Sequence, residues 1–173
     1  MTIIAETERL LIRQLEDIDE ADLYAVGSDP DVAHYMDDGT PLTAEQAHAW
    51  IGISKLNYQK AGHGNFAIVL KKNNEFIGFG GLVHPGGAPQ IEIIYGFKKA
   101  YWGQGFATEF VQQMVEVGFA RWKFAHIEAS IHIDNKASIH VVEKAGMTFL
   151  HQEIDEDGEP VVYYGINNPT LVV

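Results

Sequence analysis

The chain has 173 residues, a formal net charge of −12 and no cysteine. The lack of cysteine excludes disulfides, thiolate metal sites and a cysteine nucleophile. The negative charge argues against binding to nucleic acid or to an anionic membrane, and it suits cationic partners such as amines. The length fits one domain with a substantial core, so we expect a single domain over residues 1–173.

The cellular location and the metal content of the protein are predicted from motifs that the sequence does not contain. No apolar run reaches the roughly 18 residues that a membrane-spanning helix needs. The N-terminal stretch MTIIAETERL carries acidic residues and no basic region of the kind that opens a secretory signal, so we expect a cytoplasmic protein. The eight histidines form no HExxH motif, and His132 and His140 are separated by a predicted strand-to-helix turn. We therefore expect no metal site.

The first third of the chain is predicted to be mostly helical. The pattern predicts one strand, two short helices and a long helix, at residues 9–15, 17–26, 29–36 and 43–61, with a loop at 37–41. Thr43 and Gln46 form a capping box for the long helix. The aromatic residues Tyr35, Trp50 and Tyr58 are more typical of a core than of the wall of an acceptor site.

Two strands follow at residues 66–72 and 75–84, joined by a hairpin turn at Asn73 and Asn74. Three glycines, Gly78, Gly80 and Gly81, weaken the second strand as a packing surface. They indicate either a twisted or bulged strand, or a place where a substrate or another backbone segment comes close. The first interpretation is the simpler one.

The second half alternates strands with helices. Period-two alternation predicts a strand at residues 90–97, and apolar residues at three- and four-residue steps predict a helix at 106–121. A strand at 125–133, a helix ending near Lys144 and a closing hairpin of 147–153 and 160–166 around a turn at 155–158 complete the chain. We expect an α/β or α+β domain with a mixed, twisted sheet of about six or seven strands flanked by helices.

The connection between the 90–97 strand and the following helix has the character of an anion site. Gly103 and Gly105 allow close approach to the backbone, and the first N–H groups of a helix lack partners where the macrodipole is positive. The stretch is not a Walker loop, because no Lys-Ser or Lys-Thr follows the glycines. It is also not a full GxGxxG fingerprint, because Thr108 occupies the third glycine position. A connection without any ligand is an equally good interpretation of this stretch alone.

Three segments together resemble a known family. The segment YWGQGFATE, residues 101–109, resembles the acetyl-CoA pyrophosphate loop of GNAT N-acetyltransferases, and most of all the branch named for ribosomal-protein N-terminal acetyltransferases. The segments 135–138 and 143–147 resemble the second cofactor motif, and Glu92 before Tyr95 resembles the strand motif of that branch. These segments occur in family order and at family spacing over nearly the whole chain.

The resemblance implies a GNAT-like fold with acetyl-CoA as the acetyl donor, in a gap between the 90–97 and 125–133 strands. Backbone N–H groups of residues 102–107 would hold the phosphates, the Gln104 side chain would add a contact, and the backbone near Ile94 would polarise the carbonyl. The expected cofactor-binding residues are Ile94, Tyr95, Trp102, Gly103, Gln104, Gly105, Phe106, Ala107, Thr108 and Asn135.

Side chains around the turn leave alternatives open. Lys98 and Lys99 are near enough in sequence to reach phosphates, or they lie solvated at a strand end. Ala100 stands where the family often has Arg or Gln, so the backbone must hold more of the cofactor. Asn135 is suited to cap a helix, which does not conflict with a cofactor contact.

Glu92 and Ser138 are the expected catalytic residues. The isoleucines that flank Glu92 favour partial burial, which would raise its pKa towards the range of a general base. A solvated glutamate on an exposed face is the alternative. Many family members have a tyrosine seven residues after the asparagine that corresponds to Asn135, and this chain has Val142 at that position. Ser138 matches the serine that serves as proton donor in the branch that the chain resembles. An ordinary helix serine is the alternative for Ser138.

The function expected from the resemblance is transfer of an acetyl group from acetyl-CoA to a primary amine, by direct attack in a ternary complex. The acceptor would be a protein N-terminus or a small amine, bound near the early helices. Val142 and Ala100 leave open a CoA-binding sensor or interaction module with little or no activity. The expected partners are acetyl-CoA and the amine, without nucleic acid or membrane, and a homodimer is left open.

Overall fold

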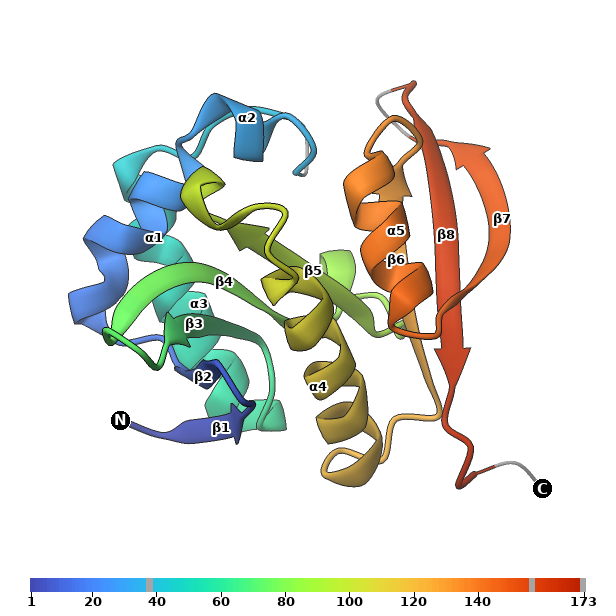
Figure 1. The fold of residues 1–173 in the computed structure, drawn as a ribbon, viewed down its shortest axis with the longest axis horizontal. Helices are drawn as coiled ribbons and strands as arrows, with labels where there is room; N and C mark the ends of the chain where they lie inside the picture. The colour runs from blue at the N-terminus through green and yellow to red at the C-terminus, as the bar shows by residue number, and fades with distance from the viewer. Residues whose placement is uncertain (37–38, 156–157, 172–173) are drawn as a thin grey trace.

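Eight strands lie side by side in one twisted sheet in the computed structural model, which describes residues 1–36, 39–155 and 158–171 (Figure 1). The strands are β1 (Ile3–Glu6), β2 (Leu10–Gln14), β3 (Asn65–Leu70), β4 (Glu75–Val83), β5 (Glu92–Phe97), β6 (His126–His132), β7 (Thr148–Ile154) and β8 (Pro160–Asn167). Their order in the sheet is β1-β2-β3-β4-β5-β6-β8-β7. All neighbours are antiparallel except β5 and β6, which are parallel.

Helices cover both faces of this sheet (Figure 1). They are α1 (Glu20–Gly27), α2 (Pro30–Ala33), α3 (Ala44–Ala61), α4 (Phe106–Ala120) and α5 (Lys136–Lys144), with 3-10 turns at Asp17–Asp19, Pro85–Gly87 and Lys99–Tyr101. The expected mixed α/β fold is confirmed. The expected count of six or seven strands was too low, because the four-residue strand β1 is too short to show an alternating pattern. The expected 17–26 helix begins as a 3-10 turn.

Two expected connections fall partly on residues outside the described ones. They are the loop at 37–41, which includes 37–38, and the turn at 155–158, which includes 156–157. The extent of a single domain over residues 1–173 stays a prediction.

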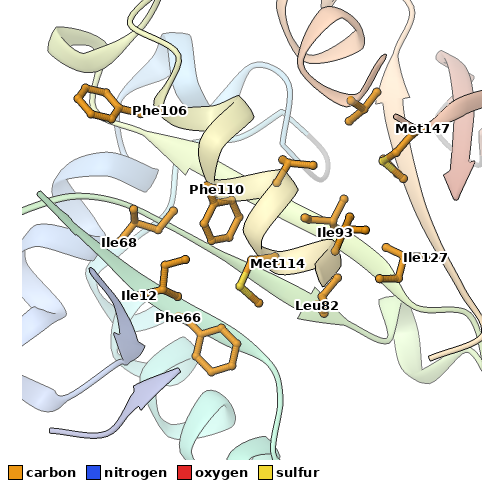
Figure 2. Packing of buried hydrophobic residues seen from close by; sticks show 14 of the residues in the cluster. Ile12, Phe66, Ile68, Leu82, Ile93, Phe106, Phe110, Met114, Ile127 and Met147 are labelled. Carbon is orange, nitrogen blue, oxygen red and sulfur yellow. The ribbon is translucent and has the colours of Figure 1, made fainter. Parts of the chain in front are cut away.

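Two hydrophobic clusters hold the helices against opposite faces of the sheet. On one face, Phe110 and Met114 of α4 are fully buried against strands β2 to β6, together with side chains of α5 (Figure 2). On the other face, Leu23 of α1 and Ile51 of α3 pack with Phe79 of β4. Burying side chains of this size contributes about 1.5–3 kcal/mol each. The α4 cluster therefore anchors the helix close to the end of β5.

The glycines of β4 are required by neighbouring backbone. A Cβ on Gly81 would lie 1.8 Å from the carbonyl oxygen of Gly64, and a Cβ on Gly78 would lie 2.4 Å from that of Gly96. The β3–β4 register also shifts between Ile68 and Val69, as at a bulge. β4 therefore has both a bulge beside it and another backbone segment close to its glycines, and that segment belongs to the same chain.

Strands β5 and β6 diverge soon after they meet. Glu92 lies opposite Glu128, and the Glu128 N–H donates to the Ile91 carbonyl at 2.9 Å. No further β5–β6 pair occurs among the described residues, although both strands continue beyond this point. One row of backbone groups on β5 therefore faces open space. On its other side, β5 pairs with β4 in unbroken register from Glu92 to Phe97.

Candidate active site

A cavity of about 700 Å³ occupies the space between the diverging strands. Residues of β5, of the glycine turn, of the start of α4, of β6 and of α5 line it. All of the expected cofactor-binding residues except Gln104 belong to this lining, and so does Ser138. The parallel pair and the strand-turn-helix segment therefore open onto one shared space, as the expected gap requires.

The glycine turn presents backbone donors at the start of α4. Gly103 and Gly105 have φ values of 71° and 82°, in the left-handed region that favours glycine. Gly105 is the N-cap, and no described side chain caps the helix there. The first N–H groups of α4 are therefore free to bind an anion, with the helix dipole in support. This donor set fits the diphosphate of a CoA molecule.

A cation from a distant part of the chain lies at the same turn. The Arg9 side chain donates from Nη1 to the Gln104 carbonyl at 2.9 Å, and its guanidinium stacks on the Phe106 ring at 4.2 Å. Glu109 holds it there, accepting from Arg9 Nε at 2.6 Å, from the Arg9 backbone N–H at 3.0 Å and from the Thr7 hydroxyl. Arg9 therefore steadies the turn and adds positive charge beside it.

Glu109 is ionised in this arrangement. Burial pushes the pKa of Glu109 upward, but the hydrogen bonds from Thr7 and Arg9, with the charge of Arg9, outweigh burial and leave the pKa lowered. Arg9 was not predicted as a site residue, because its partners lie about a hundred residues away in the chain and no local pattern joins them.

The lysines next to the turn point elsewhere. Lys98 Nζ forms ion pairs with Asp22 at 3.0 Å and with Glu75 at 3.6 Å, and Lys99 pairs with Asp31. Neither lysine lines the cavity. The Gln104 side chain donates to the Ala100 carbonyl at 2.8 Å, so it turns back along the chain. Lys144 of α5, which the sequence reasoning missed, does line the cavity.

The first turn of α5 forms the opposite wall. Asn135 is its N-cap, and its Oδ1 accepts from the Ser138 N–H at 3.1 Å. This capping bond fixes the position of Ser138 at the cavity wall. Tyr95 of β5 also lines the cavity, where burial raises its pKa to about 12 and the Ser138 hydroxyl partly opposes the rise.

Glu92 lies at the point where β5 and β6 part. Its Oε2 accepts from the Ser130 hydroxyl at 2.7 Å, and Ser130, unlike Glu92, lines the cavity. Burial raises the pKa of Glu92, the like charge of Glu128 adds to the rise, and the Ser130 hydrogen bond only partly opposes it. Glu92 is thus a half-buried carboxylate whose connection to the cavity is the Ser130 hydroxyl. Ser130 carries no sequence signal beyond its place on β6.

Aromatic side chains line the far end of the cavity. Tyr35 and Trp50 belong to its wall with Met36. Tyr35 is exposed, which does not fit the expected core position, whereas Trp50 also packs against the core, with its ring 5.6 Å from that of Phe79. The Tyr35 ring lies 5.9 Å from that of His132, across the opening between α2 and β6. Tyr58, by contrast, packs inside, where its hydroxyl accepts from the Leu15 N–H at 3.2 Å.

The described residues form neither a metal-binding cluster nor a membrane-spanning helix. Within residues 1–36, 39–155 and 158–171, no group of three or more His, Cys, Asp or Glu side chains is arranged to hold a metal ion. In the same part of the chain, no helix combines the length and apolar character needed to cross a bilayer.

The comparison with known proteins agrees with this geometry. Residues 9–148 match the acetyltransferase (GNAT) domain model. An uncharacterized N-acetyltransferase of Bacillus licheniformis is 36% identical over 143 residues, which cover 79% of this chain and 77% of the relative. The crystal structure of a GNAT-family acetyltransferase from Bacillus anthracis is 27% identical and covers 97% of this chain and 99% of its own, with a TM-score of 0.78.

RimL, a ribosomal alpha-N-protein acetyltransferase solved with coenzyme A, shares the fold at a TM-score of 0.82 with 17% identity, covering 95% of this chain and 97% of its own. The matched domain model spans most of the chain, and the relative from Bacillus licheniformis exceeds 30% identity over most of its length. The chain therefore belongs to the GNAT family and is an acetyl-CoA-dependent acyltransferase.

Proposed function

We propose that the protein acetylates a primary amine by direct attack in a ternary complex, with Glu92 as the general base acting through Ser130. The observation that carries this proposal is that the free N–H groups of α4, the unpaired edge of β5 and the Glu92–Ser130 pair all adjoin the same cavity. The lack of cysteine supports direct transfer over a thioester on the enzyme.

The glycine turn and the start of α4 would hold the diphosphate of acetyl-CoA, with Arg9 nearby. The unpaired backbone edge of β5 around Ile94 and Tyr95 would bind the pantetheine arm and polarise the thioester carbonyl. Asn135 would contact the arm from the other side. These are the groups that the cavity makes available to a ligand of this shape.

Glu92 would take a proton from the acceptor ammonium through Ser130 or a water beside it. A lysine-like amine with a pKa near 10.4 is almost wholly charged at pH 7, so a positioned base matters most for such an acceptor. Burial has already raised the Glu92 pKa in the direction that a base working near neutral pH requires. Ser138 would donate a hydrogen bond to the departing thiolate.

The acceptor is either a protein N-terminus or a small amine. Solved structures with this fold have names that give different acceptors: RimL is a ribosomal alpha-N-protein acetyltransferase, and two others are an aminoglycoside acetyltransferase and a spermidine N-acetyltransferase. They are 17%, 19% and 15% identical to the chain. Identity this low transfers the fold and not the acceptor. A panel of N-terminal peptides, polyamines and aminoglycosides, each at equal concentration with acetyl-CoA, would separate the two classes.

The Glu92→Gln variant tests the proposed base. We expect kcat to fall about 10²- to 10⁴-fold, as for loss of a positioned base, with the largest loss below pH 7.5 and with acetyl-CoA affinity unchanged. The neighbouring Glu128→Gln is the matched control. It removes the like charge that helps raise the Glu92 pKa, so it should move the acid limb of the pH profile to lower pH and leave the plateau almost intact.

An unchanged kcat and a flat pH profile in Glu92→Gln would eliminate Glu92 as the base. The alternative function, a CoA-binding sensor or interaction module, predicts acetyl-CoA binding without turnover on any amine of the panel. A cytoplasmic location and a homodimer stay predictions, which cell fractionation and light scattering would test.

A further inference from the structure

The imidazole of His126 lies between two oxygen atoms that can accept a proton. Its Nδ1 lies 2.7 Å from the side-chain oxygen of Asn167 on β8, which can only accept, so Nδ1 carries a proton. The other ring nitrogen, Nε2, lies 3.3 Å from Oε1 of Glu128, two residues further along β6. In a neutral ring this nitrogen would point a lone pair at the carboxylate, whereas an imidazolium has an N–H on both nitrogens. The arrangement therefore fits a charged His126 that forms an ion pair with Glu128.

Strand β8 leaves room for the ring in this position. Gly165 lies opposite Glu128 in the β6–β8 ladder, and a Cβ on Gly165 would come within 2.7 Å of both Cε1 and Nε2 of His126. The ring therefore lies over the glycine, and a larger residue there would push it away from its place beside Glu128. His126 and Glu128 also line a second cavity, of about 390 Å³, with residues that precede β5 and β6.

Glu128 is the neighbour of Glu92 across the parallel strands. The two glutamates are paired in register, and the Glu128 N–H donates to the Ile91 carbonyl at 2.9 Å. Neighbouring strands lie about 4.8 Å apart, and paired residues project to the same face of the sheet. Two carboxylates in these positions repel each other, which favours the protonated form of each. Burial is the main cause of the raised pKa of Glu92, and the like charge of Glu128 adds to it.

The other titratable groups around the pair do not offset the charge of Glu128. His84 lines the second cavity, but its Nδ1 contacts backbone carbonyl oxygens at 2.8 Å and 3.0 Å. Tyr163 of β8 stays a neutral phenol, because burial raises its pKa to about 12 and the carboxylate of Glu153 on β7 adds to the rise. Among the described residues, His126 is the one basic side chain within ion-pair distance of Glu128.

We propose that His126 is a positioning residue that, as an imidazolium, neutralises Glu128 and so keeps Glu92 ionised to lower pH, ready to take the proton of the acceptor amine. The proposal rests on the proposed function of Glu92. Without the imidazolium, the full charge of Glu128 acts on Glu92 and favours its protonated form, which cannot serve as a base. The proton of the amine goes to Glu92, and His126 keeps both of its own N–H protons during the transfer.

The first test follows the ionisation of Glu92 itself and needs no turnover. NMR of the isotope-labelled Glu92 carboxyl carbon, assigned by its loss in Glu92→Gln, gives the midpoint of its titration. In His126→Phe, which keeps a flat ring and removes the cation, we expect this midpoint to rise by about 0.6 pH unit, the effect of one unit charge about 5 Å away in a water-like medium. His126→Gln, a second variant without the cation, should give the same rise.

A double-mutant cycle tests whether His126 acts through Glu128. The Glu92 midpoint should fall below that of the wild type in Glu128→Gln, because the like charge is gone. The double variant of His126→Phe and Glu128→Gln should have the same midpoint as Glu128→Gln alone, since no charge is left for His126 to neutralise.

Turnover gives a second readout with a matched control. In His126→Phe the acid limb of the kcat profile should move to higher pH by the same amount, with a loss of about fourfold below the midpoint and an unchanged plateau. The control is His151→Phe, because His151 also forms an ion pair with a glutamate two residues along its strand, Glu153, at 3.8 Å. Its ring stacks on Tyr163 on β8, and a phenyl ring can keep that contact. This control should leave both the midpoint and the kcat profile unchanged.

Three results would overturn the proposal. They are a Glu92 midpoint that stays unchanged or falls in the two His126 variants, a double variant that differs from Glu128→Gln, and a loss in His126→Phe that is confined to thermal stability. Failure of the proposed function looks different, because Glu92→Gln then keeps its kcat while the Glu92 midpoint still responds to His126.

Discussion

Replacing Glu109 by glutamine should loosen the attachment of the chain's first hairpin to the start of α4. Glu109 accepts three hydrogen bonds from Thr7 and Arg9, and its side chain is only 18% exposed. The amide of Glu109→Gln keeps one oxygen as an acceptor, but its NH₂ group cannot accept from the Arg9 guanidinium. The substitution therefore removes about one hydrogen bond to a charged group and leaves Arg9 without its counter-ion.

The magnitude follows from these contacts. A hydrogen bond to a charged group contributes about 1.5–3 kcal/mol. The Arg9 side chain is 40% exposed, so water screens part of the charge, and we expect a loss of about 2 kcal/mol in the free energy of unfolding. For a domain of this size, each kcal/mol lowers Tm by about 2–4 °C, so Tm should fall by roughly 4–8 °C.

The pH dependence gives the sharper test. The pKa of Glu109 is lowered in the folded protein, so its contribution to stability is complete above the unfolded-state pKa of about 4.3. That contribution is lost as the pH falls through the folded-state pKa. The Tm difference between wild type and Glu109→Gln should therefore be full at pH 7 and shrink below about pH 4.3.

Calorimetric unfolding from pH 3.5 to 7.5 measures both effects. Glu116→Gln on the same helix is the control, because Glu116 is exposed and its replacement should leave Tm within error. Equal Tm values for wild type and Glu109→Gln at pH 7 would refute the reasoning. A difference that persists undiminished in acid would refute the assignment of the effect to an ionised Glu109.

Two further outcomes are expected. Gly81→Ala should lower the free energy of unfolding, measured in urea, by about 3 kcal/mol or more, because the new Cβ would overlap the Gly64 carbonyl. Gly52→Ala, inside α3 and with open space around it, should raise that free energy by about 0.5–1 kcal/mol. Comparable stability of the two variants would contradict this packing. Acetyl-CoA at about 100 times its Kd should add ~2.7 kcal/mol of stability, or roughly 5–10 °C in Tm, and free adenine should add none; the absence of any shift would count against the cavity as the donor site.

The elements with strong local patterns were predictable from the sequence. The capping box of α3 is present, with the Gln46 N–H donating to Thr43 Oγ1 at 3.2 Å and the Thr43 N–H donating to Gln46 Oε1 at 2.8 Å. The periodicity at residues 106–121 predicted α4, in which Phe110 and Met114 are fully buried. Strand β1 was missed because its four residues pair with β2 without a readable alternation.

In the candidate site, too, only the residues within short local patterns were predictable from the sequence. The glycine turn, Asn135 and Ser138 could be found because each lies in a short segment with its own pattern. Arg9, Ser130 and the aromatic residues of the cavity wall could not, because their positions depend on packing between segments far apart in the chain. For Lys98 and Lys99, a phosphate contact and a solvated strand end were both open from the sequence, and in the structure the two lysines form ion pairs with carboxylates from distant segments.

The parallel neighbours β5 and β6 have a consequence for where the active site must lie. Two antiparallel strands can be joined by a tight hairpin, but parallel strands require a crossover that returns the chain to the starting edge. Here α4 is that crossover, and it begins within ten residues of the end of β5. The one parallel junction among the described strands thus brings a helix start and a strand end together. A chain that closed this junction with a hairpin would lose the anion site and the opening beside it at once.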